Sequence, residues 1–194
     1  MMPEASESAI EAKEKDRAVA LIIAILALLL ALSEAGAKKA QHISTEKNIE
    51  ASDLYNFYQA KRVRSTVVET ASETLEAQKT ALVDAKAQDA FERQISDFKT
   101  IVARFEKDVK NPEDSLDSIQ ERAKAASEAR ELANRKLEHY EFGSGLTQIA
   151  IVLASAAIIT GISALVWLSV GLGVIGALLV VLGFVAPTML PFIG

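Results

Sequence analysis

The chain has 194 residues, of which 50% are hydrophobic and 24% charged, and its formal net charge is −5 at pH 7. It has no cysteine, which excludes disulfide bonds, iron–sulfur clusters and thiol catalysis. No part of the chain has the excess of basic residues that nucleic-acid binding requires, so we expect no nucleic-acid partner.

The first apolar run occupies residues 18–37 and follows a short acidic tail, residues 1–17. An α-helix of this length rises about 30 Å, which is enough to cross a bilayer. A cleavable signal peptide is the alternative, because the Ala-Gly-Ala sequence at 35–37 resembles a cleavage site. The acidic residues of the tail make a poor signal-peptide start, so we predict a retained transmembrane helix.

Glu34 is the only charged residue between Arg17 and Lys38. A carboxylate buried in the membrane would suggest an ion or proton path, which makes Glu34 a candidate intramembrane acid. The simpler interpretation places Glu34 at the headgroups near the helix end, paired with Lys38 four residues later. We favour this second interpretation.

Residues 38–141 are thoroughly charged, with 18 basic and 20 acidic residues, and contain no Gly and one Pro. A mostly apolar seam with alternating three- and four-residue steps predicts a coiled coil. Its first run is Leu54, Phe57, Lys61, Arg64, Val68, Ala71, Leu75, Gln78, Leu82 and Ala85. The other two runs are Phe91, Ile95, Phe98, Val102, Phe105 and Val109, then Leu116, Ile119, Ala123, Ala126, Arg130, Ala133, Leu137 and Tyr140.

The length of this middle segment predicts how its helices are arranged. If the chain leaves the membrane and returns to it over two legs of equal length, the reversal falls near 87–89, where Asp89 and Glu92 have capping-box spacing. Residues 111–112 are then a kink in the second leg. The sequence therefore predicts a long antiparallel coiled-coil hairpin, with a flatter three- or four-helix bundle as the alternative.

Aromatic and basic side chains gather shortly after the first predicted span. We take them as a candidate interaction face, formed by Tyr55, Phe57, Tyr58, Lys61 and Arg64. Aromatic residues and arginine are enriched in the cores of protein interfaces. Ordinary packing against the second leg is the alternative, and the hairpin would bring Lys61 and Arg64 near the acidic residues of 113–117.

The last 53 residues, 142–194, contain no Asp, Glu, Lys, Arg or His. The run is long enough to cross a bilayer twice. Its glycine-rich stretch at 169–173 predicts the break, so the expected spans are 145–168 and 174–190. One span followed by a re-entrant segment is the alternative.

Small residues recur at four- and seven-residue intervals along these two spans. The candidates for close helix packing are Ala157, Gly161, Gly173, Gly176, Ala177 and Gly183. Such residues let helix backbones approach closely in lipid. They would join subunits, pack the two spans against each other, or do both.

Two stretches resemble a known family. Residues 48–61, NIEASDLYNFYQAK, are similar to an N-x-x-A-S-D-x-aromatic-x-aromatic-aromatic-Q-A-K pattern, and residues 146–155 read LTQIAIVLAS. Both patterns are typical of an uncharacterised bacterial membrane family, domain of unknown function four-three-three-seven. The resemblance implies three spans and a bacterial inner membrane. It implies no activity.

These features predict an all-α membrane protein with three transmembrane helices and a coiled-coil hairpin between the first and second. We expect no catalytic residues, cofactor or metal, since two histidines are too few for a protein metal site. The expected partners are the lipid bilayer and further copies of the chain, as a homo-oligomeric scaffold. The alternatives are an accessory subunit of a larger membrane complex and, more weakly, an oligomeric channel or transporter lined by Thr147, Gln148, Thr160 and Ser163. Basic residues near the spans favour a cytoplasmic stalk.

Overall fold

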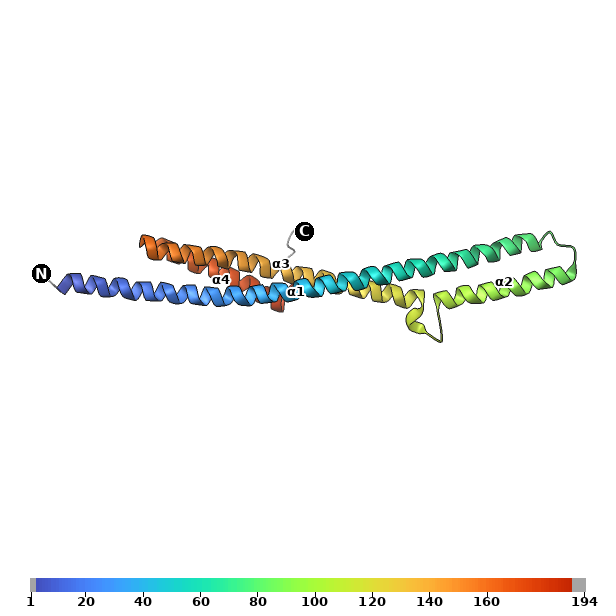
Figure 1. The fold of residues 1–194 in the computed structure, drawn as a ribbon, viewed down its shortest axis with the longest axis horizontal. Coiled ribbons are helices and arrows are strands. Elements are labelled where there is room, and N and C mark those ends of the chain that lie inside the picture. Colours follow the sequence, from blue (N-terminus) through green and yellow to red (C-terminus); the bar gives the residue numbers. More distant parts are fainter. Residues whose placement is uncertain (1–2, 190–194) are drawn as a thin grey trace. The chain divides into compact units, whose positions relative to one another are not determined.

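The computed structural model describes residues 3–189, with side chains from Lys13 onward, and within that range the chain is helical and has no strand (Figure 1). The elements are α1 (Pro3–Lys79), α2 (Ala85–Glu106), the 3₁₀ helix η1 (Pro112–Asp114), α3 (Leu116–Thr160) and α4 (Ser163–Val185). The predicted all-α class is confirmed. The chain divides into two compact units. The terminal unit joins the residues up to Thr45 with those from Glu131, and the middle unit is Glu46–Arg130.

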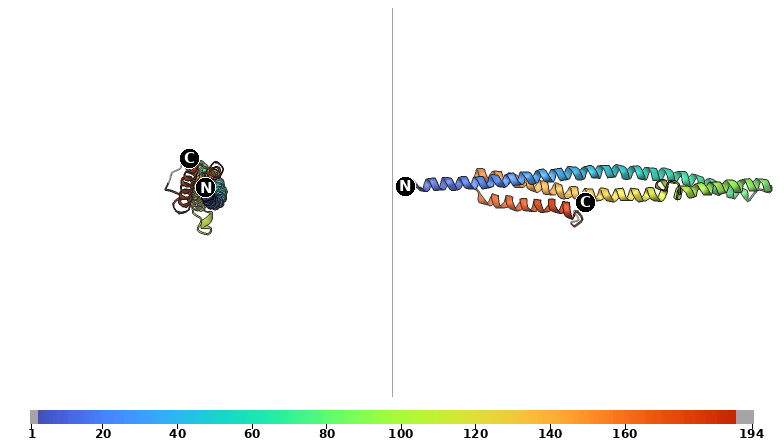
Figure 2. Two further views of the ribbon diagram at one scale, coloured as in Figure 1. Left: turned by 90° about the vertical axis from the view of Figure 1, so that its left-hand side faces the viewer. Right: turned by 90° about the horizontal axis from the view of Figure 1, so that it is seen from below.

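In the terminal unit α1, α3 and α4 lie side by side (Figures 1 and 2). The buried residues of α1 recur every seven positions, at Val19, Leu26, Ser33 and Ala40. A repeat of seven keeps one stripe of a helix facing its neighbours. Facing stripes on α3 and α4 are built largely from small residues, namely Ala133, Gly143, Ala150, Ala154, Ala157, Ser169, Gly173, Gly176 and Gly183.

Each of these three helices contains a stretch long and apolar enough to cross a membrane. Only 17% of the most apolar window is buried in α1 and in α4, and 28% in α3. Most residues of these windows are therefore not buried inside the terminal unit. The prediction of three helices suited to spanning is confirmed at this level.

The link between the last two helices lies earlier than the glycine-rich stretch suggested. Helix α3 ends at Thr160 and α4 begins at Ser163, so 161–162 is the link and α4 runs unbroken through 169–173. The predicted break was wrong, and the expected bounds at 168 and 174 both fall inside α4. Gly161 has φ +71°, a left-handed conformation that glycine adopts at little cost. Of the two glycines in 169–173, Gly173 packs against Leu26, whereas Gly171 faces open space.

In the middle unit the later part of α1 lies beside α2 and the start of α3 (Figures 1 and 2). Leu54 forms a buried cluster with Ile119 and Ala123, and Tyr58 packs against it. Ion pairs join α1 to α2: Lys79 to Glu92 at 2.9 Å, Lys99 to Glu76 at 2.7 Å and Arg62 to Glu106 at 4.0 Å. Such exposed pairs add little stability, so the apolar contacts matter more.

The α1–α2 turn is earlier than predicted. It occupies 80–84, between the end of α1 at Lys79 and the start of α2 at Ala85, whereas we expected 87–89. Asp84 is the N-cap of α2, and its side chain accepts a hydrogen bond from the backbone N–H of Lys86. The expected cap, Asp89, lies inside α2. A capping aspartate five residues upstream therefore starts this helix.

A second interruption, 107–115, separates α2 from α3 and includes residues 111–112, where a kink was expected. The Asp108 carboxylate accepts hydrogen bonds from the backbone N–H groups of Lys110, at 2.8 Å, and Asn111, at 3.1 Å. These two donors lower the pKa of Asp108 below its ordinary value. Pro112 then opens η1, where a missing N–H is tolerated.

The seam along α1 differs from the predicted one at alternate steps. Ser65 and Ser72 are buried, whereas the predicted Phe57 and Arg64 are exposed. The inward face is therefore one residue further along the chain at these steps, with Tyr58 in place of Phe57 and Ser65 in place of Arg64.

Candidate functional site

The structure divides the predicted interaction face of the middle unit. Tyr58 packs against the buried cluster of Leu54. Tyr55 and Phe57 remain open, with 42% and 47% of their surface exposed, and Arg64 is exposed as well. Tyr58 thus serves the chain's own packing, and the two open aromatics are available to a partner.

Lys61 is half-buried between two aromatic rings. Its Nζ lies 5.8 Å from the centroid of the Phe57 ring and 5.9 Å from that of Phe105. This geometry allows attraction between the ammonium group and the ring faces. Nζ also donates a hydrogen bond to the backbone carbonyl of Asp114, within the 113–117 segment that we expected near it.

Glu34 is exposed on α1. Its neighbour Ser33 points inward instead, is fully buried and donates a hydrogen bond to the Tyr140 carbonyl of α3 at 2.7 Å. The polar contact between the two helices at this level therefore comes from the serine, which the sequence analysis did not single out.

Three of the six small-residue candidates are tight contacts inside the chain. A methyl group placed on Gly173 would come within 2.5 Å of Leu26 on α1. On Gly176 it would come within 2.8 Å of the Thr147 hydroxyl of α3. On Gly183 it would come within 2.8 Å of His139 Cβ, also on α3.

The other three candidates have different surroundings. Ala157 is buried and Ala177 is half-buried. Gly161 forms the α3–α4 link, with open space around it, and takes no part in close packing. The structure therefore uses most of the predicted small-residue face to pack the chain on itself.

Hydroxyl groups inside the terminal unit bond to backbone carbonyls. Thr147 donates to Gly143 at 2.8 Å within α3, and Ser169 donates across from α4 to Ala150 at 2.7 Å. Gln148 is exposed, although we considered it with Thr147 as part of one path. The described residues also contain no group of three side chains placed to hold a metal ion.

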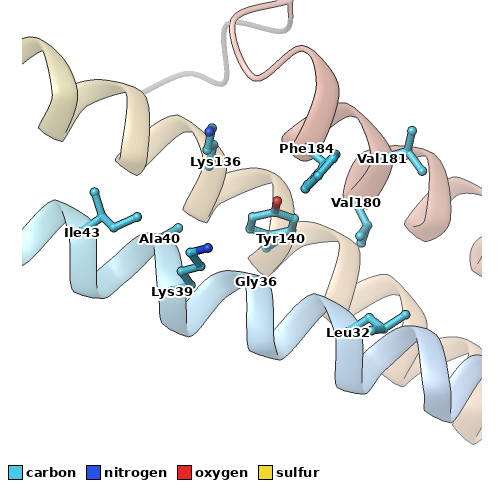
Figure 3. Close-up of a pocket in the computed structure, with 10 residues that line it drawn as sticks. All are labelled: Leu32, Gly36, Lys39, Ala40, Ile43, Lys136, Tyr140, Val180, Val181 and Phe184. Carbon is cyan, nitrogen blue, oxygen red and sulfur yellow. The ribbon is translucent and has the colours of Figure 1, made fainter.

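A groove of about 480 Å³ opens between α1, α3 and α4 (Figure 3). Aliphatic and aromatic side chains, among them Leu32, Val181 and Phe184, make up most of its lining. Lys39 from α1 and Lys136 from α3 add two basic groups. The sequence pattern does not reveal this groove, because its residues come from three segments that only the fold brings together.

Four α-helices, three of them suited to membrane spanning, place the described chain in the class of all-α proteins compatible with a multi-pass membrane arrangement. The chain belongs to the family described as Domain of unknown function (DUF4337), which it matches over residues 15–186. This match confirms the resemblance drawn from 48–61 and 146–155, both of which lie within it. No curated protein and no solved structure gives a significant match.

Proposed function

We propose that the chain is a non-enzymatic integral membrane protein of the bacterial inner membrane, with α1, α3 and α4 as its three spans. The support is the apolar outer surface of the terminal unit, where Leu28, Val152 and Leu178 are 62%, 66% and 58% exposed. Helix α4 alone has 23 residues and rises about 34 Å, close to the ~30 Å of a hydrocarbon core. Lipid would cover this surface.

We further propose that the segment between the first two spans is an antiparallel coiled-coil hairpin. Its ion pairs support this direction: as the α1 partner moves back from Lys79 to Arg62, the α2 partner advances from Glu92 to Glu106. In a parallel pair the two numbers would rise together. On α2 the buried Ile95 and half-buried residues at three- and four-residue steps around it also fit a coiled coil.

The proposed role of this hairpin is assembly into a homo-oligomeric scaffold. Tyr55 and Phe57 carry the proposal, because two open aromatic side chains beside a narrow apolar core are typical of an interface. The small-residue face in the spans has its closest contacts inside the chain. Assembly would therefore rely on the hairpin and on the outer faces of the spans.

The mass of the intact particle in a mild detergent tests the scaffold. We expect a multiple of the 20.9 kDa chain in light scattering after subtraction of detergent, and a shift toward monomer in the double variant Tyr55→Ala/Phe57→Ala. Val63→Ala/Val67→Ala is the control, since both valines are exposed on α1 outside the predicted face. A monomer at every concentration would refute the scaffold. Unrelated chains in fixed ratio would favour the accessory-subunit alternative instead.

A further inference from the structure

The groove of the terminal unit combines an apolar floor with a basic rim. Leu32, Val181 and Phe184 contribute apolar surface from α1 and α4, and the buried Tyr140 ring lies between them (Figure 3). A volume of about 480 Å³ is in the range of sites that hold small ligands. The apolar part of such a ligand would lie against α4.

The basic rim consists of Lys39 and Lys136, which reach the groove from two different helices. Among the described residues neither lysine forms an ion pair, and the residues that line the groove include no acid. Two uncompensated ammonium groups at one end of an apolar groove suit a ligand with an anionic head and an apolar tail.

The position of the groove along the helices matches the depth that such a ligand would have. Toward one end the groove meets the charge-free segments, 18–32 of α1 and α4 itself. Toward the other it meets Lys39 and Lys136, within the charged segments that begin at Glu34 on α1 and end at Glu141 on α3. In a bilayer this transition lies at the headgroups, and basic pockets between spanning helices there bind anionic lipids.

We propose that the groove binds an anionic phospholipid, with its phosphate at Lys39 and Lys136 and an acyl chain along Leu32, Val181 and Phe184. The inference rests on the proposed membrane insertion. It adds a ligand class and a site, and it does not depend on the oligomeric state of the chain.

Native mass spectrometry of the full chain released from detergent micelles tests the site, with phosphatidylglycerol and phosphatidylcholine of identical acyl chains as probes. We expect phosphatidylglycerol to be retained preferentially. In the double variant Lys39→Ala/Lys136→Ala, each lost lysine should weaken phosphatidylglycerol binding about fivefold. Phosphatidylcholine binding should not change. Lys39→Arg/Lys136→Arg should keep the preference. Free glycerol phosphate should not compete, because it lacks the acyl chains.

The matched control is Lys38→Ala/Arg135→Ala, which removes the same charge from the neighbouring positions, neither of which lines the groove. Equal losses in the control and in the groove variant would overturn the site in favour of general surface attraction. Equal retention of both lipids would also overturn it, as would competition by free glycerol phosphate. Carbonate extraction of cell membranes distinguishes failure of the lipid site from failure of the proposed membrane insertion. A chain that stays in the membrane without lipid preference refutes only the site, and a chain that is extracted refutes the membrane proposal as well.

Discussion

The glycines of α4 have different surroundings although they lie on one helix. Gly171 has open space where a side chain would stand, whereas Gly176 faces the Thr147 hydroxyl and the Gly143 carbonyl of α3. Glycine is therefore required only where α4 closely approaches α3 or α1. The sequence pattern predicted Gly173, Gly176 and Gly183 as packing positions, but it did not distinguish contacts within the chain from contacts between subunits. That distinction depends on the third helix, α1, which Gly173 contacts through Leu26.

We expect Gly176→Ala to destabilise the chain by about 1–3 kcal/mol, because the added methyl would lie 2.8 Å from the Thr147 hydroxyl and 3.0 Å from a backbone carbonyl that has little room to move. Gly171→Ala makes the same chemical change in open space and should be neutral or slightly stabilising. Thermal unfolding in detergent, followed by circular dichroism, compares the two. Equal melting temperatures would mean that α3 and α4 do not pack as described.

At the scale of the elements, sequence periodicity predicted helices and their apolar faces better than it predicted where the helices end. The three- and four-residue steps of α2 and α3 are met by buried or half-buried residues from Phe91 to Phe105 and from Leu116 to Tyr140. The predictions were wrong at helix ends, where single capping or glycine residues determine the boundary. Asp84 caps α2 ahead of the expected turn, and Gly161 provides a left-handed residue that a count of glycines could not locate.

Ser65 offers a test of the revised α1 seam. It is fully buried and its hydroxyl has no hydrogen-bond partner among the described residues, a situation that costs about 1–3 kcal/mol. We expect Ser65→Ala to stabilise the full chain against urea by about 1 kcal/mol more than Ser96→Ala, whose site on α2 is exposed. The second variant reports the helix propensity of alanine alone. If the two gains are equal, the predicted seam through Arg64 is the better one.

For the whole molecule, membrane topology follows from the order of the helices. If α1, α3 and α4 are the three proposed spans, the segment between the first two spans and the 161–162 link would lie on opposite sides of the bilayer. Lys15 Nζ of α1 donates a hydrogen bond to the hydroxyl of Ser163, the first residue of α4, at 2.7 Å. This contact places Lys15, just before the first apolar run, beside the start of α4. The sequence predicted this number of spans from the charge-free runs, because charge is the property that a bilayer selects against.

Single cysteines in this cysteine-free chain would report the two sides directly. With a cytoplasmic stalk, Ser96→Cys should resist a membrane-impermeant maleimide in intact cells with a permeabilised outer membrane, and should react in inside-out vesicles. Ile162→Cys, at a position 52% exposed in the α3–α4 link, should behave in the opposite way. Reaction of both variants from the same side would exclude an odd number of spans between them.

The short link at Gly161 has a consequence for biogenesis. From Phe142 onward the chain has no charged side chain, so the later part of α3, residues 142–160, forms an uncharged hairpin with the 161–162 link and α4. With a cytoplasmic stalk, the tip of that hairpin must reach the far side of the bilayer. It does so without moving any ionised group through hydrocarbon, so the transmembrane voltage does no work on it. This insertion step should therefore proceed equally well in energised and de-energised membranes.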